Sequence, residues 1–375
     1  MNSTFSKNEL AQQEGCLPSC PGCHDPLISP AERLAEKERF IRTVLLPWRD
    51  RMAAVGEALP ERRFGFREKV CLSAGWQERG WRFGFIRGES LVPVHHCPLH
   101  APRVNNTINL MAAVLPPADV FPLAWFLQSG AQVTLVVKSR HLPDLSWLKF
   151  EVTSALEQAG DKGLWLHLHP AAGRRVTAKN TWHLLWGEPR STDGSGLVYG
   201  PTAFRQLIPE LAAAALDTAE SFLAPAAEDF VADLYCGIGD SLRRWTRRGC
   251  RVAGVEINGE SVACARINAP AATIFRGAGR HRLPQLSAML PSDGNQRLLY
   301  ANPPRTGIEA EVMDWILAVF KPRRIACLSC NAVSLKRDLE RLTGAGYKIE
   351  QIVPYDFFPG TRYLEIMALL MRESA

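Results

Sequence analysis

The C-terminal half of this chain predicts a doubly wound α/β fold with a mostly parallel sheet. From Phe204 onward, short apolar runs alternate with segments that have the periodicity of a helix. The glycine turn Asp233-Leu-Tyr-Cys-Gly-Ile-Gly239 follows one apolar run, and Glu256 ends the next. Because repeated strand–helix–strand units build parallel sheets through right-handed crossovers, this order favours the doubly wound class.

The same alternation predicts the individual elements of this half. Each strand is a short apolar run, and each helix has an apolar face or a high alanine content. The expected strands cover 230–235, 251–256, 297–300, 324–329, 351–355 and 364–371, and the expected helices cover 211–223 and 312–320.

The middle of the chain is expected to be rich in β-strands. Residues alternate in polarity along 132–137 and again along 164–169, which is the pattern of half-buried strands. In the second run, His167 and His169 are expected on the solvent face. A helix is expected from about 30 to 48. We therefore divide the chain into an N-terminal cysteine-cluster segment with a helix (1–60), a β-rich central domain (61–195) and an α/β catalytic domain (196–375).

Composition limits the classes of protein. Hydrophobic residues make up 46% of the 375 residues, which excludes a globally disordered chain. The net charge of +6 suits a polyanionic partner. The longest apolar stretch, 108–127, is interrupted by prolines and an aspartate, and residues 1–15 are polar, so neither a membrane span nor a signal peptide is expected. We expect a cytoplasmic protein with reduced cysteines and no obligate protein partner.

The glycine turn is the expected cofactor site. Gly237 and Gly239 would let a ligand approach the backbone at the end of a strand, and Glu256 would accept hydrogen bonds from ribose hydroxyls. A dinucleotide is the alternative, but its fingerprint needs a third glycine where this chain has Leu242. A dinucleotide site also binds a pyrophosphate at the helix N-terminus. The turn therefore favours S-adenosylmethionine, which has no pyrophosphate.

Three further motifs follow strands of the same predicted sheet and should converge at its carboxyl edge. They are Asn302-Pro-Pro-Arg305, Ser329-Cys330-Asn331 and Phe358-Pro-Gly-Thr-Arg-Tyr-Leu-Glu365. An Asn-Pro-Pro followed by an aromatic residue is typical of methylation at an exocyclic amine. Here Arg305 replaces that aromatic residue. An amino-methyltransferase acting on nucleic acid or protein therefore stays as an alternative.

The cysteine and the glutamate point to carbon methylation of a pyrimidine. Carbon 5 of uracil becomes nucleophilic only after a thiolate adds to carbon 6, and a base must then remove the carbon 5 proton. Cys330 precedes a helix expected from about 332, whose dipole would lower the pKa of the thiol. Cys327 lies within an apolar strand and is expected to be inert. Glu365 is an acid in an otherwise apolar strand, so we expect it to be the base.

These motifs resemble, in order and spacing, those of the RNA uracil carbon-5 methyltransferases, which are class I enzymes with a Rossmann-like catalytic domain. The resemblance is closest to the shorter branch, which lacks a TRAM domain, acts on 23S ribosomal RNA in rRNA processing and carries Asn-Pro-Pro-Arg. It implies that Cys330 is the nucleophile and Glu365 the base. The cofactor residues that it implies are Gln206, Tyr235, Glu256 and Asn302.

Two positions depart from the family pattern. Ile208 replaces an asparagine two residues after Gln206, and Tyr363 replaces a histidine two residues before Glu365. The resemblance is strong from about Phe204 to the end and weak over 100–195. A diverged, non-catalytic RNA-binding factor that kept the fold is therefore a further alternative.

Four cysteines form a candidate metal site. Cys16, Cys20 and Cys23 lie within eight residues, and Cys97 is a plausible fourth ligand. Such spacing suits an iron–sulfur cluster or zinc, the latter with a nearby histidine. The histidines concerned are His24, His95 and His100. The resemblance implies a four-iron–four-sulfur cluster, [4Fe-4S], held by all four cysteines.

The three N-terminal cysteines also have the spacing of radical S-adenosylmethionine enzymes. Those enzymes need an aromatic residue just before the third cysteine, a position that Gly22 occupies here. We therefore expect the metal site to be structural and to fasten the N-terminal segment to the β-rich domain.

Overall fold

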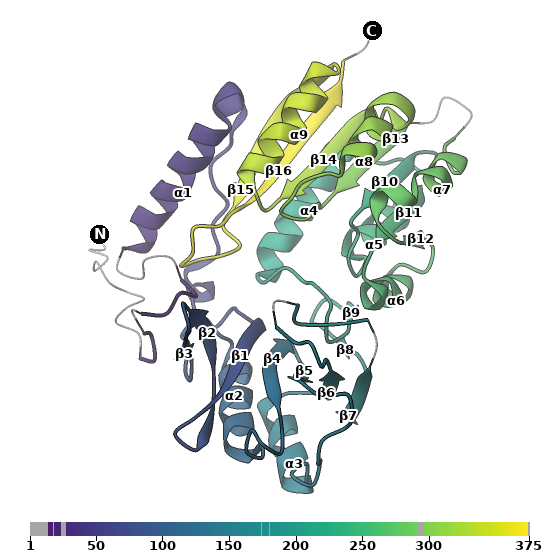
Figure 1. Cartoon of the computed structure of the whole chain (residues 1–375). Coiled ribbons are helices and arrows are strands. Elements are labelled where there is room, and N and C mark those ends of the chain that lie inside the picture. Colours follow the sequence, from purple (N-terminus) through teal and green to yellow (C-terminus); the bar gives the residue numbers. More distant parts are fainter. Residues whose placement is uncertain are drawn as a thin grey trace. The chain divides into compact units, whose positions relative to one another are not determined.

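The computed structural model describes residues 14–17, 19–23, 28–173, 175–179, 181–291 and 296–373. These residues form two compact units, each with its own seven-stranded sheet (Figure 1). Unit 1 contains the described residues up to 30 together with 59–193 and 199–202, and unit 2 contains 31–58, 194–198 and the described residues from 203 onward.

Unit 1 is the β-rich part. Its sheet has the order β3-β2-β1-β4-β5-β6-β7, and all pairs are antiparallel except β5 with β6. The apolar sides of helices α2 and α3 pack on the alternating apolar residues of the strands and close one core (Figure 1). The strands are β1 (Lys69–Gln77), β2 (Gly80–Arg87), β3 (Ser90–Pro93), β4 (Leu123–Ser129), β5 (Gln132–Val137), β6 (Gly163–Leu168) and β7 (Trp182–Gly187), and the helices are η2 (Pro60–Arg62), α2 (Pro102–Val114) and α3 (Phe150–Ala159).

The expectation that His167 and His169 face solvent is wrong. His167 is fully buried and His169 is 8% exposed. The His167 ring stacks on Trp182, with 4.1 Å between the ring centroids, and its Nε2 accepts a hydrogen bond of 2.8 Å from the amide of Ala178. The alternation of polarity along β6 is real, but the chain that follows β6 covers its polar face.

Unit 2 confirms the doubly wound prediction. Its sheet has the order β12-β11-β10-β13-β14-β16-β15, parallel up to β14 and antiparallel where β16 lies between β14 and β15. The chain reverses from β11 and β12 to β13 beside β10, so the carboxyl ends of β10 and β13 meet there. The strands are β10 (Phe230–Leu234), β11 (Arg251–Glu256), β12 (Thr273–Arg276), β13 (Arg297–Ala301), β14 (Arg324–Ser329), β15 (Tyr347–Tyr355) and β16 (Glu365–Arg372).

Helices cover this sheet, and their apolar faces join its strands in one core. The π-helical turn η4 continues α8, so the apolar helical face expected at 312–320 consists of two joined helical segments. The helices of unit 2 are α1 (Pro30–Val44), η1 (Leu46–Arg51), α4 (Pro209–Leu223), α5 (Asp240–Arg247), α6 (Gly259–Asn268), η3 (Gly279–His281), α7 (Leu283–Ala288), α8 (Ala310–Trp315), η4 (Ile316–Phe320) and α9 (Ala332–Gly344). A separate two-stranded sheet pairs β8 (Ser191–Thr192) with β9 (Val198–Tyr199).

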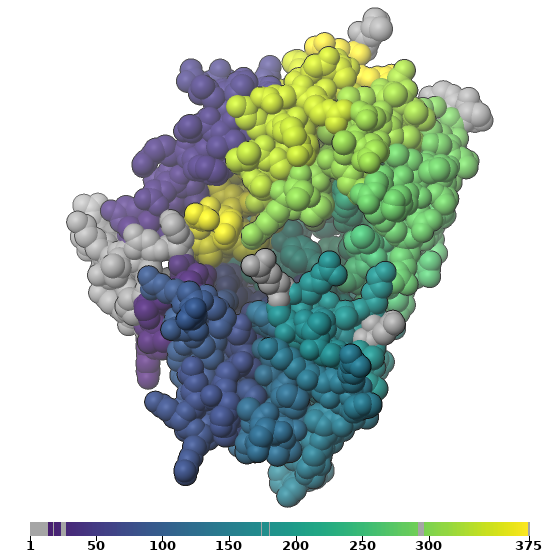
Figure 2. Space-filling view, in the orientation of Figure 1, coloured from purple at the N-terminus to yellow at the C-terminus, as the bar shows by residue number. Residues whose placement is uncertain are grey.

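Residues 31–58 belong to unit 2 rather than to a segment of their own. Ile41 of α1 and Leu45, the residue just after its C-terminal end, are buried in the core of unit 2. The stretch after η1 then runs beside the edge strand β15. There the amide of Ala53 donates to the carbonyl of Ile352, and that of Gly56 to the carbonyl of Pro354, both over 2.8 Å. Figures 1 and 2 show α1, in purple, next to the C-terminal elements in yellow.

The structure thus divides the expected 1–60 segment between the two units. The part of the chain before α1, with the described cysteines, packs in unit 1, whereas α1 and η1 pack in unit 2. Among the described residues, no helix is both long and apolar enough to cross a membrane.

Candidate active site

The glycine turn after β10 leaves its backbone open on one side. Tyr235, Gly237 and Gly239 all have positive φ angles, of 62°, 55° and 86°. A Cβ atom added to Gly237 would meet nothing within 4 Å, whereas one on Gly239 would lie 3.1 Å from Ala265 of α6. Gly239 is therefore required for helix packing, and Gly237 leaves free space in which a ligand can approach the backbone.

Glu256, at the end of β11, faces this turn. One carboxylate oxygen accepts a hydrogen bond of 3.1 Å from the amide of Gly237, and the other accepts one of 2.7 Å from the amide of Asn258. Both oxygens can accept further bonds, as ribose hydroxyls would require. The amide of Asn302 donates to the carbonyl of Leu234 over 3.1 Å, which brings the loop after β13 to the same edge.

Gln206 has an unsatisfied side chain. Its amide oxygen and nitrogen are both buried, and neither has a hydrogen-bond partner among the residues that the structure describes. A buried amide without partners is costly, and a polar ligand that both donates and accepts would satisfy it. Together with the free space at Gly237 and the carboxylate of Glu256, this chemistry fits S-adenosylmethionine, with its amino acid and ribose groups.

Cys330 and Glu365 meet at the adjoining part of the sheet edge. The last antiparallel pair of β14 with β16 is Ser329 opposite Ile366. Cys330 follows Ser329 directly and Glu365 precedes Ile366 directly, so both residues adjoin this last pair, and the charge of Glu365 acts on the Cys330 thiol. The sequence motifs of the nucleophile and the base therefore come together in space as expected.

Burial sets the protonation of both groups. Glu365 is 3% exposed, its Oε2 has no hydrogen-bond partner in the described part of the chain, and burial raises the pKa of its carboxyl to about 8. The pKa of the Cys330 thiol is also raised, first by burial and then by the charge of Glu365. Arg305 opposes both shifts, because its positive charge lowers the pKa of each group.

The expectation that a helix dipole lowers the pKa of Cys330 is wrong. The N-cap of α9 is Asn331, whose side-chain oxygen accepts a hydrogen bond of 3.0 Å from the amide of Val333. Cys330 therefore precedes the cap and lies outside the first turn, where the field of a helix falls off. Burial and the neighbouring carboxyl outweigh whatever field remains.

The loop 302–308 is fastened to α9. The side-chain amide of Asn331 donates to the carbonyl of Arg305 over 2.9 Å, and the Asp338 carboxylate accepts a bond of the same length from the amide of Ile308. Gly307 has a φ of 81°, and a Cβ there would lie 2.6 Å from Asp338. The loop that brings Arg305 to Cys330 thus has a fixed backbone.

Three comparisons with known proteins agree with this site. The family model described as tRNA (Uracil-5-)-methyltransferase matches residues 282–373, a span that includes Arg305, Cys330 and Glu365. A protein of Thermosynechococcus vestitus named an uncharacterized RNA methyltransferase is 27% identical over 94% of this chain and 82% of its own length. The 23S rRNA (uracil(1939)-C(5))-methyltransferase RlmD of Pseudomonas fluorescens is 25% identical over 97% of this chain and 82% of its own.

A solved structure has the same fold over both units. It is the tRNA (uracil-54, C5)-methyltransferase of Pyrococcus abyssi, with a TM-score of 0.69 and 20% identity over 94% of this chain and 86% of that one. These matches support an RNA uracil-C5 methyltransferase. The chain is accordingly an S-adenosylmethionine-dependent RNA methyltransferase.

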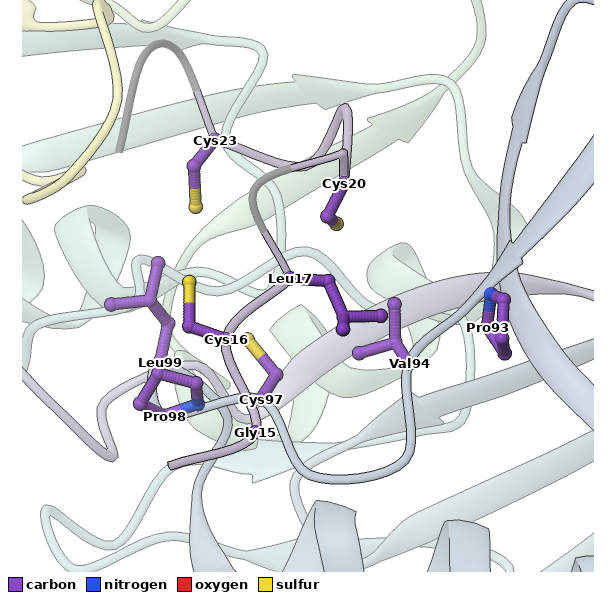
Figure 3. A pocket seen from close by; sticks show the side chains of 10 residues that line it. All are labelled: Gly15, Cys16, Leu17, Cys20, Cys23, Pro93, Val94, Cys97, Pro98 and Leu99. Carbon is purple, nitrogen blue, oxygen red and sulfur yellow. The ribbon is translucent and has the colours of Figure 1, made fainter. Parts of the chain in front are cut away.

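In this methyltransferase the four expected metal-binding cysteines line one pocket of unit 1. Figure 3 shows Cys16, Cys20 and Cys23 on the N-terminal segment and Cys97 on the segment after β3. Burial, together with the other three thiols and against the opposing charge of Arg67, raises the pKa of the Cys23 thiol to about 11. The four thiols are therefore near enough to influence one another, as a shared ligand would require.

Among the described residues, no three or more side chains of histidine, cysteine, aspartate or glutamate are placed to hold a metal ion. Of the histidines in the zinc alternative, His95 and His100 do not line the cysteine pocket, and His24 lies outside the described residues. The pocket is thus lined by thiols, without either described histidine.

Sequence reasoning missed two contacts of this methyltransferase site. Lys37, a buried lysine on α1, binds Asp356 at the start of the loop that leads to Glu365. The guanidinium of Arg305 stacks over the ring of Tyr363. Neither could be found from motif spacing, because each joins residues far apart in the chain and only the fold brings them together.

Proposed function

We propose that this enzyme methylates carbon 5 of a uridine in 23S ribosomal RNA through a covalent bond between Cys330 and the base, with Glu365 as the general base. The observation that carries the proposal is the placement of Cys330 directly after Ser329 and of Glu365 directly before Ile366, the last pair of β14 with β16. A thiol alone can be a packing residue, but a thiol paired with a buried carboxyl is what the two half-reactions need.

The first step is addition of the Cys330 sulfur to carbon 6 of the uracil. The thiol must lose its proton to solvent first, so that the Glu365 carboxylate is still unprotonated when the carbon 5 proton has to be removed. Because the pKa of Glu365 is raised to about 8, its carboxylate is a stronger base than an exposed glutamate. Arg305 favours the thiolate through its charge. The electron pair of the carbon 5–carbon 6 double bond then makes carbon 5 nucleophilic.

S-adenosylmethionine, when bound by Gln206, Tyr235, Gly237, Glu256 and Asn302, supplies the methyl group to carbon 5. Glu365 next removes the proton that remains at carbon 5. The electron pair of that bond re-forms the double bond, and the carbon–sulfur bond breaks to release the Cys330 thiolate. The proton from carbon 5 thus ends on Glu365, and the electron pair of the broken carbon–sulfur bond ends on the Cys330 sulfur.

Support for 23S rRNA as the substrate comes from the RlmD relatives, which act on a uracil of that RNA by name. The net charge of +6 suits the phosphates of RNA. The target base must leave its stack to reach Cys330, so single-stranded or looped RNA should react faster than a duplex of the same sequence.

The decisive experiment replaces Glu365 by glutamine. Glu365→Gln keeps the shape of the side chain but cannot accept the carbon 5 proton, so a methylated enzyme–RNA adduct should accumulate and survive a denaturing gel. Cys330→Ala combined with Glu365→Gln should give no adduct. Normal turnover by Glu365→Gln, or complete loss of methyl transfer without any adduct, would refute the role of Glu365 as base.

The target is tested separately by mass spectrometry of ribosomal RNA from a deletion strain. Loss of a single 5-methyluridine supports the proposed reaction. Loss of an N-methylated base would point to the amino-methyltransferase alternative, and unchanged RNA to a non-catalytic factor or a different RNA.

We also propose that Cys16, Cys20, Cys23 and Cys97 hold a four-iron–four-sulfur cluster. Such a cluster is larger than a single ion and keeps its thiolates farther apart, so thiols too dispersed for one ion still suit it. The described residues that line the pocket include four cysteines and no histidine, which favours iron–sulfur over zinc with histidine. The cluster would join the N-terminal segment to the chain after β3 and need not take part in the reaction.

A further inference from the structure

Two arginine side chains lie over the ring of Tyr363, the residue that departs from the family pattern. The guanidinium carbon of Arg305 lies 4.8 Å from the ring centroid, and that of Arg362 lies 5.6 Å from it. The ring is 38% exposed, so it is reachable from the open edge of the sheet. A tyrosine ring attracts cations through its negative face, and arginine also stacks on it as a flat group.

Arg305 has an exposed side chain whose guanidinium acts on the Cys330 thiol through its charge and a hydrogen bond and lies over the ring of Tyr363. The carbonyl of Arg305 accepts a hydrogen bond from Asn331, which fixes the loop. An exposed arginine has many rotamers and loses considerable entropy when it is confined to one. The Tyr363 ring is the flat surface that confines it.

The position of this guanidinium matters because of the groups around it. The charged groups that face the Cys330 thiol are Glu365 on β16 and Arg305 on the loop after β13. The charge of Arg305 lowers the pKa of Glu365, and the charge of Glu365 is one of those that raise the pKa of the buried Tyr300 phenol. Glu365 favours the neutral thiol and Arg305 favours the thiolate, so the balance depends on where the guanidinium lies.

We propose that Tyr363 is a positioning residue that holds the Arg305 guanidinium against Cys330 and thereby favours the thiolate of the nucleophile. The proposal deepens the proposed function, on which it rests, by adding a residue that prepares the nucleophile before RNA binds. Tyr363 acts through Arg305 and needs no contact with the substrate. Its phenol oxygen is not required, because the contact is made by the face of the ring.

The test measures the Cys330 thiolate in the free enzyme, without RNA or S-adenosylmethionine. The protein is alkylated with iodoacetamide over a pH series, and the rate at Cys330 is followed by mass spectrometry of its peptide. Only the thiolate reacts, so the midpoint of the rate profile reports the pKa of Cys330. Thermal melting of each variant checks that it is folded.

Tyr363→Ala and Arg305→Gln should both move the midpoint to higher pH. At pH 7.5 the alkylation rate of Tyr363→Ala should fall about two- to fivefold, the size expected when an exposed cation–ring contact is lost. Tyr363→Phe keeps the ring and should behave as the wild type. Arg362→Ala is the matched control, since it removes the other cation on the same ring but leaves Arg305 in place.

A double variant separates positioning from a general structural effect. If Tyr363 acts through Arg305, Tyr363→Ala should cause no further shift in the Arg305→Gln background. A wild-type profile for Tyr363→Ala, or a shift that adds to that of Arg305→Gln, would overturn the proposal. Alkylation does not depend on methyl transfer, so this result stands apart from the adduct test at Glu365.

Discussion

Lys37 of α1 donates a hydrogen bond of 2.6 Å to the carboxylate of Asp356 and a second one of 3.1 Å to the carbonyl of Phe358. Its side chain is 2% exposed. Burial lowers the pKa of Lys37, and the charge of Asp356 acts in the opposite direction. Because Asp356 and Phe358 begin the loop that leads to Glu365, α1 fixes the start of that loop.

Lys37→Met should therefore destabilise the protein and loosen the Glu365 loop. The variant leaves the Asp356 carboxylate in a largely buried place without its partner, which costs about 3–5 kcal/mol. Chemical denaturation measures this change in the free energy of unfolding. The matched control is Lys336→Met on α9, whose partner Glu340 lies 3.8 Å away and whose side chain is 41% exposed. Its effect should stay below about 1 kcal/mol, and equal losses in the two variants would contradict the role of Lys37.

The two cysteines of the 327–330 region should respond oppositely to replacement by alanine. Cys330→Ala should abolish methylation and leave S-adenosylmethionine binding intact, because the cofactor residues lie elsewhere. Cys327 is 2% exposed in the core of unit 2, so Cys327→Ala should keep activity and cost about 1 kcal/mol of stability. Methyl transfer to RNA and calorimetric titration with the cofactor check both. An active Cys330→Ala with a dead Cys327→Ala would reverse the assignment.

Much of unit 2 could be predicted because its local and overall patterns agree. The strands at 251–256 and 324–329 have the predicted bounds, since buried parallel strands are short apolar runs that end at polar turns. The motifs at Cys330 and Glu365 were expected to converge because both lie at the same end of the sheet. That both adjoin the same strand pair followed only from the register of β14 with β16.

The errors arose where the outcome depends on distant contacts. His167 lies on the polar face of its strand, but the later Ala178–Trp182 segment covers it. The pKa of Cys330 was expected to fall from a local argument about the helix, whereas burial and Glu365 raise it. No motif in the sequence points to Lys37, and only the fold brings it to Asp356.

Gly237→Ala should weaken S-adenosylmethionine binding at little cost to folding. A Cβ at Gly237 meets no protein atom within 4 Å, so it would project into the space left for the ligand. Both Gly237 and Gly88, in the β2–β3 turn, have positive φ, of 55° and 61°, and both have open space around them. Gly88→Ala is therefore the matched control for backbone strain. We expect the two variants to lose similar amounts of stability and only Gly237→Ala to bind S-adenosylmethionine more weakly. An unchanged affinity of Gly237→Ala for S-adenosylmethionine would count against the cofactor site.

Iron and sulfide should be present in anaerobically purified protein and lost when a pocket cysteine is replaced. Cys97→Ser removes the thiol contributed from outside the N-terminal segment, so the content of iron per chain should fall sharply. Cys71→Ser is the matched control, because Cys71 is also in unit 1 but does not line the pocket. Metal analysis and the visible absorption spectrum check the outcome. Stoichiometric zinc without iron in the wild type would contradict the cluster.

Glu365 should make the stability of the enzyme depend on pH in a definite direction. Its pKa is about 8 in the folded protein against an ordinary value of 4.5, because burial disfavours the charged carboxylate. The folded state therefore binds this proton more tightly than the unfolded state does. Stability contributed by the protonated form is complete below pH 4.5 and is lost as the pH rises to about 8.

Glu365→Gln cannot ionise, so this loss should disappear in the variant. Its Tm should be close to that of the wild type at pH 5 and should exceed it increasingly up to about pH 8.5. Asp161 and Asp233 are also buried with a pKa raised to about 7, but both proteins contain them and their contributions cancel in the difference. Cys330→Ala is the matched control, since it removes the neighbouring thiol and leaves Glu365 buried. Its Tm should therefore fall with pH as the wild type does. A difference in Tm between Glu365→Gln and the wild type that stays constant from pH 5 to 8.5 would contradict this prediction. Glu365 would then already be ionised at neutral pH. It would lack the raised basicity that the proposed elimination step requires.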